Sequence, residues 1–138
     1  MTRQSLVASF LSVILCATVL DAASLPVHAE AITLEGKNFA SLQAFLVGSW
    51  TWIRREPAQV VHMRFGNDGS FFFNNATIKL MHYGNYKTTE KGIELTILRS
   101  CDPNGCENRT TPVVHNYSLR PETPNRFMAG SEEWNRDP

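Results

Sequence analysis

The chain has 138 residues, with 13 basic and 13 acidic side chains and a formal net charge of zero at pH 7. This balance, without runs of like charge, predicts no attraction to nucleic acid or to an anionic membrane surface. A chain of this length forms one small domain that buries roughly two-thirds of its unfolded surface.

The first 29 residues have the pattern of a secretory signal peptide. Arg3 gives a positive start, a continuous apolar run extends from Leu6 to Leu20, and Val27–Ala29 resembles a cleavage site. The run is shorter than the about 20 residues that cross a bilayer, which disfavours a retained anchor. A lipid on Cys16 is disfavoured because no small residue precedes it. We therefore expect a periplasmic or secreted domain, residues 30–138, without a membrane span.

The stretch from Gly36 to Gly48 is the only part of the mature chain with helical periodicity. Asn38 is a suitable N-cap and Gly48 ends the pattern. The apolar residues that recur every three or four positions are Phe39, Leu42, Phe45 and Leu46. The pattern predicts one short helix before the rest of the fold.

Everything after Gly48 reads as short strands with alternating apolar and polar residues, separated by turns rich in Gly, Pro, Asn and Asp. The connections are mostly of hairpin length, and only one face of each strand is apolar. This predicts an all-β fold, in which an up-and-down antiparallel meander closes into a barrel of seven or eight strands. The expected strands are 49–55, 60–65, 70–75, 77–87, 93–98, 113–120, 126–130 and 132–136.

Two cysteines remain once the leader is removed, Cys101 and Cys106. An even number in an exported domain indicates a disulfide, and the turn formers between the two would place it in a tight loop between strands. A redox role is disfavoured because the pair lacks the C-x-x-C spacing. Zinc would need further ligands from scattered histidines. We expect a structural bridge and no metal site.

The order of these elements resembles that of lipocalins and of shorter, bacterial lipocalin-like domains of the calycin type. Gly48–Trp50 matches their G-x-W signature, and residues 64–73 resemble their F-x-x-D-G-x-F hairpin. Gly84, Tyr86 and Leu95 occupy matching places in a later segment. The T-D-Y signature of true lipocalins has no counterpart, so the resemblance is to the lipocalin-like domains. It implies a barrel that binds a small, largely apolar ligand. We expect no catalysis and no cofactor.

The resemblance also assigns structural roles to Trp50 and Arg136. The first tryptophan would plug the closed end of the barrel, and Trp52 would point into the same interior one layer higher. An arginine of the last strand would lie across Trp50, with Arg136 the first candidate and Arg126 the second. The alternatives are core tryptophans of an unrelated sandwich and a frayed C-terminal tail.

The expected interior is mostly apolar with a few polar groups, as in many small-molecule pockets. We expect the ligand-binding residues to be Trp52, Met63, Tyr86, His115 and Tyr117. No hydrolase, metalloprotease or phosphate-binding motif is present.

Two alternatives to a ligand-filled barrel stay open. Small barrels are often filled by their own side chains. The domain could also be a protein-binding module, similar to an inhibitor, that acts through its loops. The loops proposed for that role are residues 54–59 and 101–112.

Overall fold

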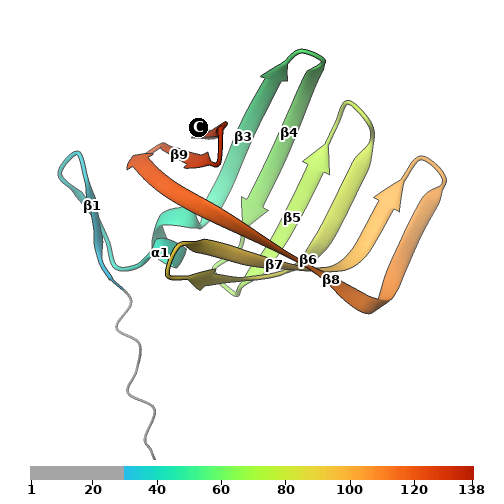
Figure 1. The fold of residues 1–138 in the computed structure, drawn as a ribbon, viewed down its shortest axis with the longest axis horizontal. Helices are drawn as coiled ribbons and strands as arrows, with labels where there is room; N and C mark the ends of the chain where they lie inside the picture. Colours follow the sequence, from blue (N-terminus) through green and yellow to red (C-terminus); the bar gives the residue numbers. More distant parts are fainter. Residues whose placement is uncertain (1–29) are drawn as a thin grey trace, which may run out of the picture.

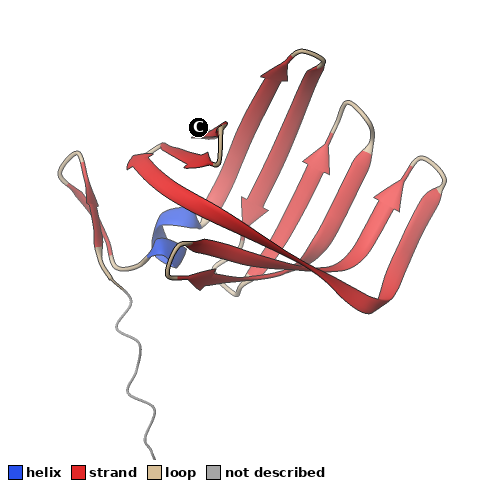
Figure 2. Cartoon of the chain, in the orientation of Figure 1, coloured by secondary structure: helices blue, strands red, loops and turns tan. Residues whose placement is uncertain are grey.

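The computed structural model describes residues 30–138, so the predicted signal peptide lies outside the described residues. The described part of the chain forms a closed antiparallel barrel of eight strands, with a small hairpin and a short helix before it (Figure 1). Strands dominate the structure (Figure 2). The predicted all-β barrel is therefore confirmed.

The barrel strands follow one another around the barrel in chain order, and the last strand pairs with the first. Each neighbour is antiparallel, which confirms the up-and-down meander. The strands are β3 (Gly48–Arg55), β4 (Ala58–Phe65), β5 (Ser70–Asn75), β6 (Leu80–Thr89), β7 (Gly92–Asp102), β8 (Gly105–Thr123), β9 (Arg126–Ala129) and β10 (Glu132–Arg136).

The segment from Gly36 to Gly48, expected to be one helix, is largely different. Strands β1 (Ile32–Leu34) and β2 (Lys37–Phe39) form a hairpin, and helix α1 spans only Leu42–Leu46. Positive φ angles at Glu35 and Gly36 make the two-residue turn that favours this hairpin. Ser41, instead of Asn38, caps the helix, because its Oγ accepts a hydrogen bond from the Ala44 N–H at 3.1 Å.

Trp50 fills the end of the barrel that α1 covers. Its side chain is completely buried, and its indole N–H donates to the Leu46 carbonyl oxygen at 2.7 Å. The rings of Phe45 and Phe127 pack against it, with centroids 5.3 and 4.7 Å away. Trp50 therefore joins the helix to the barrel floor.

Arg136 lies over Trp50, in the place that the resemblance to lipocalin-like domains implied for it. Its Cζ is 4.2 Å from the centroid of the Trp50 ring. The guanidinium donates to the carbonyl oxygens of Phe45 at 2.6 Å, Val47 at 2.8 Å and Pro124 at 3.2 Å. The tail is thus held by the helix end and is not frayed.

The conformation and surroundings of Gly48 explain why the G-x-W motif has a glycine at this position. Its φ is +128°, a conformation that side chains rarely adopt, and a Cβ there would lie 2.8 Å from Arg136 Nη1. The glycine therefore leaves the room in which the guanidinium reaches the Val47 carbonyl. Arg126, the second candidate, instead contacts the Glu122 carboxylate at 3.1 Å.

The two segments expected to be long loops are β-hairpins. Only Glu56 and Pro57 separate β3 from β4, and only Pro103 and Asn104 separate β7 from β8. Strand β8 begins at Gly105, eight residues earlier than the expected strand at 113–120. Extended backbone therefore replaces most of the predicted loop at 101–112, paired with β7 at 105–108 and bulged at 109–112.

The expected disulfide is present and joins Cys101 to Cys106 across the β7–β8 hairpin. The two residues are direct partners in the strand register, with Cα atoms 4.0 Å apart. The bridge therefore braces the hairpin near its tip.

Replacing both cysteines with serine should lower the free energy of unfolding by about 2 kcal/mol, because the bridge closes a ring of only about six residues. Urea unfolding at pH 7 measures this loss. Reduced wild-type protein is the matched control and should unfold like the double variant. A difference below about 0.5 kcal/mol would show that the bridge adds no stability.

Candidate functional site

A cavity of about 220 Å³ lies inside the barrel. A smaller apolar cavity, of about 150 Å³, is large enough to bind benzene. The walls are apolar and mostly aromatic, formed by Trp52, Val61, Met63, Phe65, Phe73, Ile93, Leu119, Phe127 and Trp134. Three polar side chains, Asn75, Tyr117 and Glu132, complete the lining.

Side chains alternate between the two faces of β10, so every second residue points into the barrel. Three inward side chains therefore follow one another along the barrel axis. Arg136 lies at the helix-covered end, opposite Trp50, and Trp134 lies one level away, opposite Trp52. The rings of Trp52 and Trp134 are stacked, with centroids 6.1 Å apart. Glu132 follows on the same face and lines the cavity beyond them.

Asn75 is buried but is used by the fold. Its Oδ1 accepts from the backbone N–H groups of Thr77 and Ile78, at 3.2 and 3.4 Å, and its amide donates to Gln59 Oε1 at 3.3 Å. Asn75 therefore shapes the turn between β5 and β6. Because of this turn, β6 begins at Leu80 and not at residue 77 as expected. Ile78, which was expected on the inner face of the strand, is 51% exposed.

The other polar groups have fewer partners. No ion pair or hydrogen bond joins the Glu132 carboxylate to any side chain of residues 30–138, and the buried indole N–H of Trp134 has no acceptor there. Burial raises the pKa of the Tyr117 hydroxyl, and the nearby Glu132 carboxylate raises it further. Tyr117 is 42% exposed, so it lies where the cavity meets solvent.

Three of the five predicted ligand-binding residues line the cavity, namely Trp52, Met63 and Tyr117. Tyr86 does not; it is buried in the core, packs against Phe65 and donates to the Gly66 carbonyl oxygen at 2.9 Å. Burial also raises the pKa of its hydroxyl.

His115 lies outside the cavity and is exposed. It pairs with Leu95 of β7, but β9 meets β8 only from Leu119 onward. The inner face of β8 before Leu119 is therefore not covered by a closing strand. Glu132 and Trp134 were missed as cavity residues, although the alternation of "EEWNR" places them together on one face.

A small polar cluster surrounds His82, beside the cavity wall. The imidazole stacks on Phe73, with centroids 5.4 Å apart, and its Nδ1 lies 3.0 Å from Ser100 Oγ. The same hydroxyl accepts from Arg109 Nε at 3.1 Å. Burial lowers the pKa of His82, and the charges of Arg109 and His115 lower it further.

A lowered pKa makes His82 a source of acid sensitivity. The unfolded chain binds its proton near pH 6.5, whereas the folded protein binds it only at lower pH. The free energy of unfolding should therefore fall as the pH drops below about 6.5. Urea unfolding at pH 7.5 and 5.0 should show a smaller decrease for His82→Gln than for wild type. The exposed His62→Gln variant should keep the wild-type decrease; equal behaviour of both variants would contradict the prediction.

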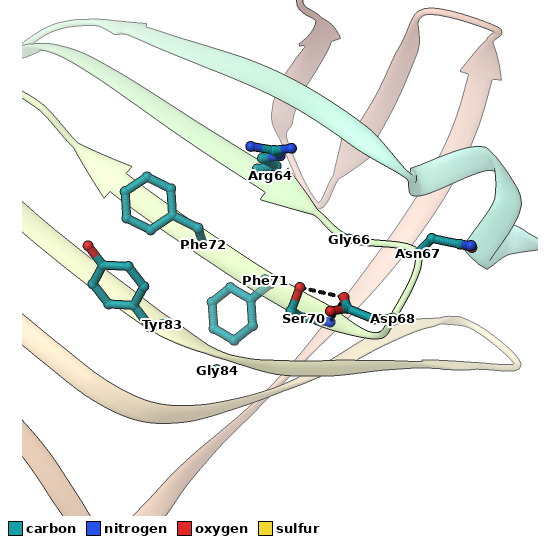
Figure 3. Close-up of a pocket in the computed structure, with 9 residues that line it drawn as sticks. All are labelled: Arg64, Gly66, Asn67, Asp68, Ser70, Phe71, Phe72, Tyr83 and Gly84. Atoms are coloured by element: carbon teal, nitrogen blue, oxygen red, sulfur yellow. Dashed lines mark hydrogen bonds between the residues drawn. The ribbon is translucent and has the colours of Figure 1, made fainter.

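A second, open hollow of about 720 Å³ lies on the outer surface of the barrel (Figure 3). Arg64, Phe72 and Tyr83 stand side by side there on β4, β5 and β6, and the two rings are 4.9 Å apart. Asp68 accepts from the Ser70 hydroxyl at 2.6 Å and from its N–H at 3.0 Å, and these bonds lower the pKa of its carboxyl. Asp68 is therefore part of the turn structure.

No three His, Cys, Asp or Glu side chains of residues 30–138 gather as metal ligands. No helix in the same range has the length and apolarity to cross a bilayer.

Comparison of the sequence with family models, and of the chain with curated proteins and solved structures, finds no match.

Proposed function

We propose that this protein is an exported, lipocalin-like binding protein that holds a small, largely apolar molecule inside its barrel and catalyses no reaction. The observation that carries the proposal is the 220 Å³ cavity with nine apolar wall residues. A barrel filled by its own side chains would leave few voids larger than a water molecule. The cavity therefore favours a carrier over a filled barrel.

The arrangement of the two ends supports the same function. Trp50, Arg136 and α1 block one end, whereas Tyr117 and Glu132 at the cavity margin are partly exposed. A ligand would thus enter from the end opposite the helix. The motifs that resemble lipocalin-like domains meet at the blocked end, and the disulfide is typical of an oxidising compartment outside the cytoplasm.

Extraction of the purified protein with organic solvent, followed by mass spectrometry, should recover the bound molecule. Binding of the recovered compound should quench tryptophan fluorescence, because Trp52 and Trp134 form the wall. Leu119→Phe fills the cavity and should weaken binding at least about tenfold through steric exclusion. The matched control is Leu98→Phe, at a residue 40% exposed and outside the cavity, which should bind like wild type.

An empty extract, together with no quenching by neutral or cationic aromatic compounds, would overturn the carrier function. The outer hollow favours a protein-binding module as the second candidate, because Arg, Tyr and Phe side chains are enriched in protein interfaces. In that case Tyr83→Ser should abolish co-purification of a partner, whereas Leu119→Phe should not.

A further inference from the structure

Glu132 is the one charged residue among the described residues that line the cavity. Basic side chains on nearby strands have other partners: the Arg54 Nε donates to the Glu56 carbonyl oxygen at 3.0 Å, and Arg120 and Arg126 contact Glu122 at 2.9 and 3.1 Å. Arg136 is held by three backbone carbonyls at the other end. No basic side chain of residues 30–138 forms an ion pair with the Glu132 carboxylate of the cavity.

Aromatic rings form much of the wall around this carboxylate. Trp52 and Trp134 are stacked, and Phe127 lies parallel to Trp134 with centroids 6.0 Å apart. Tyr117 lies close enough to Glu132 for the carboxylate to affect its hydroxyl, and Phe73 adds a further ring to the lining. The face of an aromatic ring attracts cations, most strongly in tryptophan. The carboxylate and the rings thus make the same region favourable for positive charge.

The Glu132 side chain is partly exposed and has no ion-pair partner among residues 30–138. A ligand that brings its own positive charge would supply that partner, and attraction between opposite charges is stronger beside apolar walls than in bulk water. A small, strongly hydrated cation without an apolar part would fit poorly, because the remaining walls are apolar.

We propose that the ligand of the barrel is an organic cation, an alkylammonium or quaternary ammonium group attached to an aromatic or aliphatic body somewhat larger than benzene. This inference rests on the proposed carrier function. The ammonium group would lie beside Glu132 among the rings, and the apolar body would lie deeper, against Val61, Met63 and Phe65.

Two probes of the same shape separate charge from hydrophobicity: phenyltrimethylammonium and its neutral isostere, tert-butylbenzene. Tryptophan quenching gives the dissociation constant of each. Wild-type protein should bind the cation about tenfold more tightly than the neutral probe. Glu132→Gln should weaken binding of the cation and so reduce this preference to the part that the aromatic rings provide.

Glu133→Gln is the matched control, because it removes the same charge from the adjacent exposed position of β10. It should keep the preference for the cation. If wild type binds the neutral probe as tightly as the cation, the cation inference is wrong and the carrier function stands. If Glu132→Gln keeps the full preference, the placement of the ammonium group beside Glu132 is wrong. If neither probe binds and solvent extraction recovers nothing, the carrier function itself is wrong.

Discussion

Replacing Trp50 with alanine should lower the free energy of unfolding by about 3–5 kcal/mol, as is usual for a buried large aromatic residue. Trp50 is fully buried and contacts Phe45 and Phe127 across the barrel floor. The substitution also leaves the Leu46 carbonyl without its indole donor. The loss therefore combines a cavity, a missing hydrogen bond and a detached helix.

Urea unfolding followed by circular dichroism measures this effect. Trp50→Phe should lie between alanine and wild type, because it keeps a ring but not the N–H group. Ile53→Ala is a control on the same strand, at a residue 64% exposed, and should change stability by less than about 0.5 kcal/mol. A small loss for Trp50→Ala would mean that α1 does not depend on the tryptophan.

The two neighbouring tryptophans show what alternation along a strand can predict. Trp50 and Trp52 share a face of β3, and the structure places one at the barrel floor and the other at the cavity wall. The pairing of β10 with β3 could also be predicted, because a meander closes when its last strand meets its first. These features depend only on a period of two and on chain order.

Alternation could not predict how far a strand is covered by others. His115 and Tyr117 share one face of β8, yet only Tyr117 reaches the cavity. The difference arises because β9 is four residues long and pairs with β8 only from Leu119. Strand length and register, which are set by the packing of the whole barrel, decide which inward residue is buried.

Local sequence patterns also gave the wrong secondary structure in two segments, around Phe39 and after Cys106. Phe39 lies three residues before Leu42 and so fits the helical pattern. The turn at Glu35 and Gly36 instead places Phe39 in strand β2. In the region after Cys106, polar residues suggested a loop. Pairing of residues 105–108 with the end of β7 makes it part of a strand, and a bulge at 109–112 joins it to the pairing from Val113 onward. Most of this hairpin is exposed and therefore needs no apolar residues.

Strand β10 connects the fold with the proposed function. Its inward side chains are, in order, a carboxylate at the cavity, a tryptophan in the wall and an arginine at the closed end. The proposed binding site thus lies at one end of β10, and the contacts that hold the fold together lie at the other. Substitutions at Glu132 should therefore change ligand preference, whereas substitutions at Arg136 should change folding.

Arg136→Ala is expected to lower the free energy of unfolding by about 2–4 kcal/mol, because it removes charged hydrogen bonds and a cation–π contact together. Its three acceptors are the carbonyls of Phe45, Val47 and Pro124, which belong to two separate segments. Burial lowers the pKa of the guanidinium, but an arginine stays protonated at any pH used for such measurements.

Urea unfolding of Arg136→Ala, Arg136→Lys and Arg120→Ala tests this prediction. Lysine keeps the charge but cannot present the planar set of donors that reaches three carbonyls, so it should recover only part of the loss. Arg120, whose side chain is 74% exposed, should contribute less than about 1 kcal/mol. A double-mutant cycle of Arg136→Ala with Trp50→Phe should give a small coupling energy, because phenylalanine keeps a ring face beneath the guanidinium. The cycle of Arg136→Ala with Trp50→Ala should give a coupling energy of about 0.5–2 kcal/mol. Additive losses in the alanine cycle would show that the carbonyl contacts alone hold Arg136 in place.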